Sequence, residues 1–206
     1  GSNNWAVFGK KSSTGFPIVS NDIHLDFSLP SMWYQVQLVS PTQNVYGISL
    51  AGAPGVIIGF SKKLAWAVTN ASSDFMDWYE LKYKDAGHDE YLFGSEYRKV
   101  EEHKHTILVR GSKPVEAILK ATHFGPIVFD NETSADIKMI PHGLALRWTV
   151  LEPSNELKNL LALNHGQSIK DCDEALKDFG APSQNFICSD IDKNVKMGIR
   201  GNYPLR

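Results

Sequence analysis

The sequence has no long apolar run and almost no net charge. None of its apolar runs approaches the roughly 20 residues that a membrane-spanning helix needs. The formal net charge of −2 excludes the basic footprint of a nucleic-acid-binding protein and the polybasic patch that binds anionic membrane surfaces. We therefore expect neither nucleic acid nor a membrane as a partner.

Cysteine is also scarce, with only Cys172 and Cys188 in the chain. Their spacing fits no zinc or redox motif. Cys172 lies in a predicted helix and Cys188 in a predicted strand. We expect two free thiols or half-buried small apolar side chains, and a disulfide between them is the alternative that the sequence leaves open.

The N-terminal residues lack the apolar segment of a signal peptide, since Gly1-Ser2-Asn3-Asn4-Trp5 is polar. Any export signal is therefore expected outside this chain. The chain is not disordered, because 42% of its 206 residues are hydrophobic and they are spread from end to end. That content suffices for one sizeable domain or for part of a larger one.

Most of the chain up to residue 150 has the pattern of short β-strands. Apolar and β-branched runs recur at short intervals, and Gly, Pro, Asn and Ser separate them. A polar stretch at 85–102 predicts a hairpin with an exposed loop. The predicted strands cover residues 5–8, 17–20, 34–39, 45–50, 56–60, 64–69, 78–83, 106–109, 115–121, 127–129 and 144–150.

Helical spacing of apolar residues begins after Glu152, at 155–164 and at 168–179. Ser168 with Asp171 resembles a capping box, and glycines follow both segments. Two strands at 185–189 and 195–199 come last. The pattern predicts one unit over residues 1–206, rich in strands, with two late helices packing on a sheet.

Several blocks of residues along the chain form a recognisable set. They are Gly1-Ser2-Asn3-Asn4-Trp5, Asn21-Asp22-Ile23-His24-Leu25, Leu29-Pro30-Ser31-Met32-Trp33-Tyr34, the residues at 47–55 and 64–71, Ala145-Leu146-Arg147-Trp148-Thr149, and Gln184-Asn185-Phe186. In order and spacing these blocks resemble the catalytic β-chain of the penicillin acylases, also called penicillin amidases. Ile23 stands where that family usually has proline, and the resemblance covers nearly the whole chain.

The resemblance implies an amidase with an N-terminal serine nucleophile. In the family a Gly–Ser bond cleaves itself, which here makes Gly1-Ser2 the processing site. Ser2 would attack the amide and its freed α-amine would act as base, since an α-amine titrates near pH 8. His24 would hold or polarise Ser2. The Asn70 backbone N–H and the Asn185 side chain would donate to the oxyanion.

Further residues receive roles from the same resemblance. Leu25, Met32, Ile58 and Val68 would line an apolar acyl pocket. Asp74 and Asp77, with the backbone carbonyl of Met76, fall where the family binds calcium, and carboxylate and carbonyl oxygens suit that ion. The alternative is a pair of solvated turn carboxylates. No cofactor is required for the chemistry. Arg206 matches an arginine that steadies the catalytic cluster.

The fold implied by the resemblance is α+β, the N-terminal-nucleophile (Ntn) hydrolase arrangement of two antiparallel sheets between helical layers. The chain is then expected to be a fragment of the catalytic β-subunit that lacks the α-subunit and the rest of the β-chain. While Gly1 remains attached, the Ser2 nitrogen is a non-basic amide, so the chain itself is expected to be inactive. The family implies a periplasmic or extracellular bacterial location.

The leading hypothesis is a hydrolase of linear amide bonds that removes the side-chain acyl group of a β-lactam antibiotic or an acyl-homoserine lactone. A second hypothesis is a non-catalytic fragment or pseudo-enzyme that binds a ligand or a partner chain. A third is an unrelated secreted β-rich binding module, for which the triplets beginning at Asn70 and Asn131 would be glycosylation sites.

Overall fold

The computed structural model describes residues 1–128 and 143–205. The chain divides into two compact units, of which unit 1 comprises Gly1–Asp74 and Glu152–Arg206 and unit 2 comprises Phe75–Leu151. Arg206 itself and the triplet at Asn131 lie outside the described residues. The predicted limits of the domain, residues 1 and 206, stay a prediction.

Unit 1 is built on a six-stranded antiparallel sheet with the strand order β15-β14-β6-β5-β4-β3. A separate two-stranded hairpin, β1–β2, contacts β6 and β14. The strands of the unit are β1 Ser2–Val7, β2 Ile18–Ile23, β3 Trp33–Val39, β4 Asn44–Leu50, β5 Ile58–Ser61, β6 Leu64–Asn70, β14 Gln184–Asp190 and β15 Val195–Arg200, and the 3-10 helix η1 Gly9–Lys11 follows β1.

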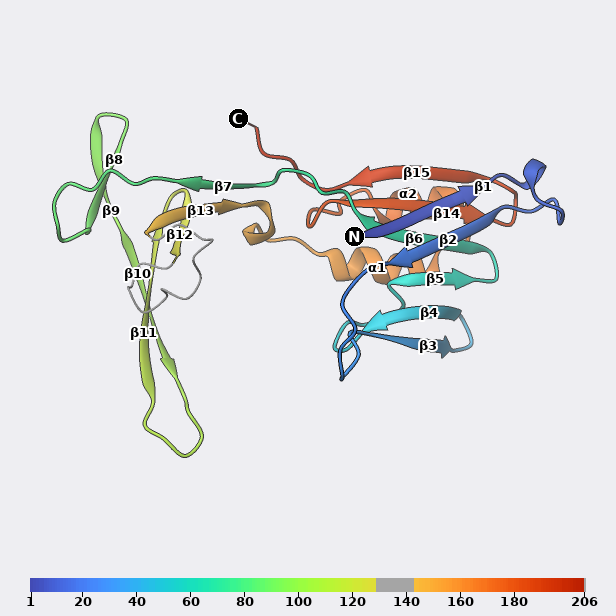
Figure 1. Cartoon of the computed structure of the whole chain (residues 1–206), viewed down its shortest axis with the longest axis horizontal. Coiled ribbons are helices and arrows are strands. Elements are labelled where there is room, and N and C mark those ends of the chain that lie inside the picture. Colours follow the sequence, from blue (N-terminus) through green and yellow to red (C-terminus); the bar gives the residue numbers. More distant parts are fainter. Residues whose placement is uncertain (129–142, 206) are drawn as a thin grey trace. The chain divides into compact units, whose positions relative to one another are not determined.

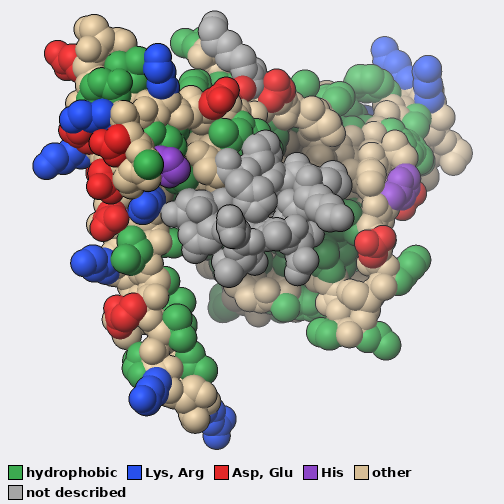
Figure 2. Space-filling view, turned by 60° about the vertical axis from the view of Figure 1, so that its left-hand side comes forward, with side chains coloured by type: hydrophobic (Ala, Val, Ile, Leu, Met, Phe, Trp, Pro, Cys, Tyr) green, Lys and Arg blue, Asp and Glu red, His purple; other side chains and the backbone are tan. Residues whose placement is uncertain are grey.

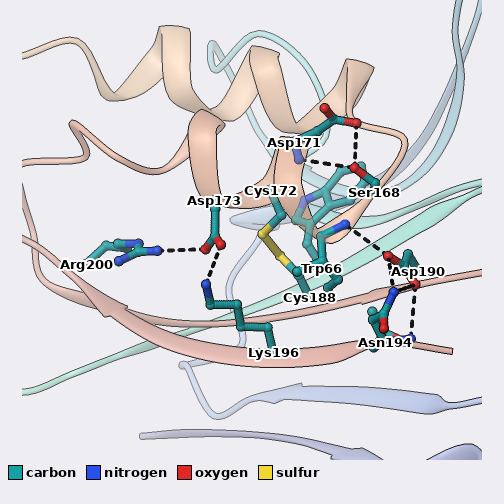
Figure 3. The surroundings of a disulfide bond; sticks show 12 residues. Trp66, Ser168, Asp171, Cys172, Asp173, Cys188, Asp190, Asn194, Lys196 and Arg200 are labelled. Atoms are coloured by element: carbon teal, nitrogen blue, oxygen red, sulfur yellow. Dashed lines mark hydrogen bonds and ion pairs between the residues drawn. A yellow bond between two sulfur atoms is a disulfide. The ribbon is translucent and has the colours of Figure 1, made fainter. Parts of the chain in front are cut away.

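The two faces of this sheet have different covers. Helices α1 (Glu156–His165) and α2 (Ile169–Ala175) lie on one face, and the β1–β2 hairpin crosses the other (Figures 1 and 3). Since strand side chains alternate, the even-numbered residues of β6 and β14 face the helices. They form the core with helix residues, namely Val45, Val56, Leu64, Trp66, Leu163, Cys172, Ala175, Leu176, Phe179, Phe186 and Cys188.

Local sequence explains where the helices begin. The Asn155 side chain accepts from Lys158 N at the start of α1. The predicted capping box is confirmed, because Ser168 Oγ accepts from Asp171 N at 3.3 Å. α2 ends at Ala175, four residues before the predicted end at 179. The chain turns there while Leu176 and Phe179 stay buried, which explains why their spacing suggested a longer helix.

The expectation of two free thiols is wrong. Cys172 of α2 and Cys188 of β14 form a disulfide, so the helix is covalently joined to the central part of the sheet (Figure 3). Both residues project into the same helix-facing core. Spacing alone did not indicate the pair, because the two cysteines meet only once α2 lies on β14.

Unit 2 contains a five-stranded antiparallel sheet, with the order β10-β11-β12-β13-β7, and the hairpin β8–β9. Its small core is Leu81, Tyr91, Ile127 and Ala145. Lys and Arg are interspersed with Asp and Glu on the face shown in Figure 2, in keeping with the small net charge. The elements are β7 Met76–Tyr79, β8 Glu90–Phe93, β9 Glu96–Lys99, β10 Glu101–Ile107, β11 Val115–Thr122, β12 Gly125–Val128, β13 Leu144–Trp148 and the 3-10 helix η3 Thr149–Leu151.

The predicted α+β class is confirmed at the level of a strand-rich chain with antiparallel sheets and two late helices. β10 begins at Glu101, five residues earlier than predicted. Its exposed residues pair with β11, and only the first two of them belong to the polar stretch that was predicted as a hairpin with an exposed loop. Within the described residues, neither α-helix has the length and apolar character needed to cross a bilayer.

Candidate functional site

A cavity of about 600 Å³ in unit 1 brings together residues far apart in sequence. Ser2 of β1, Asn70 of β6 and Gln184 of β14 line it, together with residues from α1 and from the segment after α2. Its remaining lining is mostly apolar, including Leu50, Ile57, Leu160, Phe179, Pro182 and Phe186. The cavity therefore joins a hydroxyl, backbone amides and an apolar wall.

Ser2 pairs with Ile23 across the β1–β2 hairpin, and both line the cavity. The ladder continues one residue further, because His24 N donates to Gly1 O at 2.8 Å and the Gly1 amine donates to His24 O at 3.0 Å. While the Gly1–Ser2 bond is intact, the Ser2 nitrogen is an amide and cannot accept a proton.

The His24 imidazole is exposed and bonds to a neighbouring carboxylate, with His24 Nε2 2.7 Å from Asp22 Oδ2. The ring also lies close to Gly1, because its Nδ1 is 3.8 Å from the point where a Cβ on Gly1 would be. No direct bond between the ring and Ser2 is seen among the described residues, so the predicted role of the ring remains a prediction.

The Asn70 backbone N–H points away from β14. Ala71 N donates to Ser183 O at 3.1 Å, and Asn70 pairs with Gln184 in the same ladder. Alternate residues of a strand direct their N–H groups to opposite edges, so Asn70 N–H shares an edge with Val68 N–H. The Val68 group donates to Asn21 Oδ1. Asn70 N–H is thus the next donor along this edge, at the end of β6 beside the cavity.

Asn185 lies beside this donor, but its amide N–H groups already have acceptors. Asn185 Nδ2 donates to Thr69 Oγ1 and to Asn70 O, each at 3.2 Å. A second-donor role would require one of these bonds to break when substrate binds, and it remains a prediction. In the structure the Asn185 side chain holds the Thr69-Asn70 backbone in place.

Two further asparagines attach the hairpin that carries Ser2 to the main sheet, and sequence reasoning assigned them no role. Asn4 Nδ2 donates to Asn185 O at 3.2 Å. Asn21 Oδ1 accepts from Val68 N, as described above. Asn4 pairs directly with Asn21 across the hairpin. Both belong to blocks that carried the resemblance, but their function depends on contacts far away in sequence.

Three of the four predicted acyl-pocket residues, Leu25, Ile58 and Val68, line the cavity. Met32 is not among its lining residues and is 49% exposed. Its neighbour Trp33, the first residue of β3, lines the cavity instead. Neighbouring residues of an extended chain point to opposite sides, so a shift of one residue decides which side chain lines the cavity.

Glu156 is a charged residue of the cavity lining that the sequence did not single out. Burial acts to raise its pKa, but a hydrogen bond from Ser154 Oγ and bonds from the N–H groups of Ala181 and Gly180 outweigh it, so the pKa lies below its ordinary value. The carboxylate is held as an anion that fixes the turn at Gly180–Pro182 against α1.

The predicted calcium ligands come from both units of the chain, and the calcium site remains a prediction. Asp74 ends the first segment of unit 1, whereas Met76 and Asp77 belong to β7 of unit 2. No group of three or more His, Cys, Asp or Glu side chains among the described residues could hold a metal ion. Two carboxylates and one carbonyl fall short of the six or more oxygens that calcium takes.

The comparison with protein families agrees with this geometry. The profile of the family described as penicillin amidase matches residues 1–206. The chain belongs to the penicillin amidase family.

Relatives within this family carry acylase names. The chain is 31% identical over 212 residues to the acyl-homoserine lactone acylase QuiP of Pseudomonas aeruginosa, which matches 100% of this chain and 25% of that protein. It is 27% identical over 208 residues to the penicillin acylase 2 proenzyme of Pseudomonas sp. strain SE83, again over 100% of this chain and 26% of the relative. The chain therefore spans about a quarter of the length of these relatives.

A solved structure gives the fold of this family member. The thermostable penicillin G acylase from Alcaligenes faecalis aligns with a TM-score of 0.80 and 20% sequence identity, over 98% of this chain and 35% of that chain. At this level of identity the likeness concerns the fold.

Proposed function

We propose that this chain is the nucleophile-bearing part of an Ntn amidase. The parent enzyme would hydrolyse the linear amide between an acyl group and a small molecule of the β-lactam or acyl-homoserine lactone type. The relatives' names, penicillin acylase and acyl-homoserine lactone acylase, support both substrate types for those proteins. The apolar lining of the cavity supports an acyl group as the part that is bound.

The observation that carries the proposal is that Ser2 and Asn70 line the same cavity. They are 68 positions apart in the sequence, and both were predicted from the resemblance. A hydroxyl and a backbone N–H that line one cavity can supply a nucleophile and an oxyanion donor.

The chemistry begins with loss of Gly1. The Ser2 nitrogen then becomes an α-amine that titrates near pH 8 and accepts the hydroxyl proton as the oxygen attacks the acyl carbonyl. The amide carbonyl oxygen becomes an anion beside Asn70 N–H. The amine leaving group takes the proton and departs, and an acyl-ester on Ser2 remains for water to hydrolyse. With Gly1 attached, we expect no turnover by this route.

Asn70 N–H stabilises the developing oxyanion only if its backbone stays in place. The Asn185 amide and the Gln184 amide both bond to Asn70, at its carbonyl oxygen and its side chain respectively. Asn4 and Asn21 hold the Ser2 hairpin on the same two strands. The nucleophile and the donor are thus fixed to one framework, which is what preorganised catalysis requires.

The rest of the enzyme lies in further polypeptide under this proposal. The helices, the six-stranded sheet and the β1–β2 hairpin would be three layers of an α-β-β-α fold, with residues 1–206 as part of the β-chain's domain. A companion α-subunit and the remaining β-chain would complete the acyl pocket and any calcium site. A periplasmic or extracellular location would agree with the disulfide.

The proposal is tested on a full-length protein that contains this chain. Mass spectrometry identifies the N-terminal residue, and hydrolysis is measured with a chromogenic phenylacetyl amide and with an acyl-homoserine lactone. We expect activity once Ser2 is N-terminal, a rate that rises with pH through the amine's titration, and loss of activity in Ser2→Ala.

Ser13→Ala is the matched control, because Ser13 is exposed and lies outside the cavity lining. It should keep the wild-type rate. An N-terminal Ser2 without turnover of either substrate would refute the amidase and favour the non-catalytic alternative.

A further inference from the structure

Gln184 is a polar side chain in the wall of the apolar cavity. It is only 9% exposed and is the first residue of β14, directly across from Asn70. Gln184 Nε2 donates to Asn70 Oδ1 at 2.8 Å. The Gln184 amide therefore lies within one side chain of the proposed oxyanion donor, at the reacting end of the cavity.

The Gln184 amide has hydrogen-bonding capacity left over. A carboxamide offers two N–H donors and one carbonyl oxygen. In the described part of the chain, its recorded bond uses one N–H, and Gln184 Oε1 accepts from no described residue. This unpartnered oxygen, Gln184 Oε1, is not fully enclosed by the described residues, so a bound molecule can reach it.

Two other polar side chains of this wall already accept hydrogen bonds from neighbouring residues. Glu156 accepts from Ser154, Gly180 and Ala181. Thr69 Oγ1 accepts from Asn185. Gln184 lines the same cavity, and among the described residues its amide keeps one donor and one acceptor still to satisfy.

We propose that Gln184 selects acyl groups that carry a hydroxyl within a few carbons of the reacting carbonyl. A hydroxyl both donates to Oε1 and accepts from the second N–H, which satisfies the amide. A keto oxygen could only accept, and a methylene would leave both amide groups unpaired against an apolar wall. The inference rests on the proposed function, since it assigns the acyl group of the same site.

The test measures binding of carboxylic acid products, which needs no turnover. Octanoate, 2-hydroxyoctanoate and 3-hydroxyoctanoate are titrated by calorimetry into the full-length protein, and the fluorescence of Trp33 in the cavity wall gives a second signal. We expect one hydroxy acid to bind about tenfold more tightly than octanoate, as one satisfied buried polar group implies.

Gln184→Leu keeps the side-chain size but removes the amide, so it should bring the acids to within about twofold of one another. Gln35→Leu is the matched control, because Gln35 is exposed on β3 and lies outside the cavity lining, and it should keep the wild-type preference. A merely structural role of Gln184 would weaken all acids together without changing their ratio.

Equal affinity of the wild type for all three acids would overturn the inference, and so would a preference that survives in Gln184→Leu. The wild-type comparison decides even if Gln184→Leu does not fold. Absence of binding for every acid also overturns it. The proposed amidase is judged separately, by the Ser2 assay, so the two failures are distinguishable.

Discussion

Asn164 of α1 shows how one side chain closes the hydrogen bonds of a buried loop. It is 2% exposed, accepts from Val56 N at 2.8 Å and donates to Val56 O at 2.7 Å and to Leu160 O at 2.8 Å. Val56 itself is fully buried. The backbone of the β4–β5 connection is thus satisfied by a helix more than 100 residues later.

Asn164→Leu should lower the free energy of unfolding by about 3 kcal/mol, because it leaves the Val56 N–H and C=O groups buried without partners. Urea denaturation measures the effect. Asn3→Leu is the control, since Asn3 is exposed on β1, and it should change stability by less than about 0.5 kcal/mol. Equal losses in the two variants would show that the Asn164 bonds contribute nothing.

Asn185 gives a prediction about catalysis under the proposed function. Asn185→Ala removes the bonds to Thr69 and Asn70 and should lower kcat by about 100-fold, since the oxyanion donor loses its support. Thr69→Val removes only one bond and should cause a smaller loss. Steady-state kinetics with one amide substrate measures both. A normal rate in Thr69→Val beside a large loss in Asn185→Ala would instead indicate a direct donor role.

Residue roles were only partly predictable from sequence. The resemblance placed Ser2, Asn70, Leu25, Ile58 and Val68, which the structure gathers around one cavity. It missed the anchoring asparagines Asn4 and Asn21 and the side chains Glu156 and Gln184, because their partners come from distant strands and turns. Side-chain direction is also hard to predict where one step along the chain matters, as with Met32, whose neighbour Trp33 lines the cavity instead.

At the scale of elements, the attachment of α2 to β14 is both covalent and polar. The Cys172–Cys188 disulfide joins them, and Asp173 of α2 forms ion pairs with Lys196 and Arg200 of β15 (Figure 3). Asp190, the last residue of β14, accepts from Ile169 N at the start of α2. The helix is therefore held to the sheet at its first residue and at its middle.

Reduction of the disulfide should lower the free energy of unfolding by about 3 kcal/mol, since it closes a loop between residues 16 positions apart. Urea denaturation with and without a reductant measures this. The double variant Cys172→Ala, Cys188→Ala should not respond to the reductant. A wild type that ignores the reductant, with the bond shown broken by thiol titration, would contradict the prediction.

Asp190 should make stability depend on acid. It is 5% exposed, and burial acts to raise its pKa, but the Asn194 side chain and the N–H groups of Ile169, Asn194 and Asp192 outweigh burial and lower the pKa below its ordinary value of 3.8. A lowered pKa in the folded state stabilises the protein above the ordinary value, and that stabilisation disappears as the pH falls through the folded-state pKa.

The free-energy difference between the wild type and Asp190→Asn should therefore be largest near neutral pH and shrink as the pH falls below 3.8. Urea midpoints at a series of pH values measure it. Asp26→Asn is the control, because Asp26 is exposed, and its difference from the wild type should stay near zero. A difference for Asp190→Asn that does not vary with pH would refute the assignment.

Element type was largely predictable, and element length less so. Apolar and β-branched runs located β3, β4, β6 and β14 within about two residues, and apolar spacing with the capping residue Ser168 located the helix starts. β1 begins at Ser2, three residues before the predicted start, because it pairs with β2 and not because its sequence favours a strand. Such pairing depends on a partner that local sequence does not show.

For the whole molecule, the division into two units has a consequence for folding. Unit 1 is discontinuous in sequence, but it contains the full cavity lining, the disulfide and the larger core. The segments that enter and leave unit 2 lie side by side, since Met76 pairs with Trp148 and Thr149 N donates to Phe75 O at 3.2 Å. A short linker can therefore join Asp74 to Glu152.

Replacing residues 75–151 with a Gly/Ser linker of roughly six residues should leave unit 1 folded, because its core and its hydrogen-bonded framework remain complete. Urea denaturation followed by tryptophan fluorescence should show one cooperative transition that a reductant weakens. The same shortened chain with Cys172→Ala and Cys188→Ala is the control and should not respond to the reductant. A shortened chain without a cooperative transition would mean that unit 1 depends on unit 2, and the site would then belong to the whole chain and not to one unit.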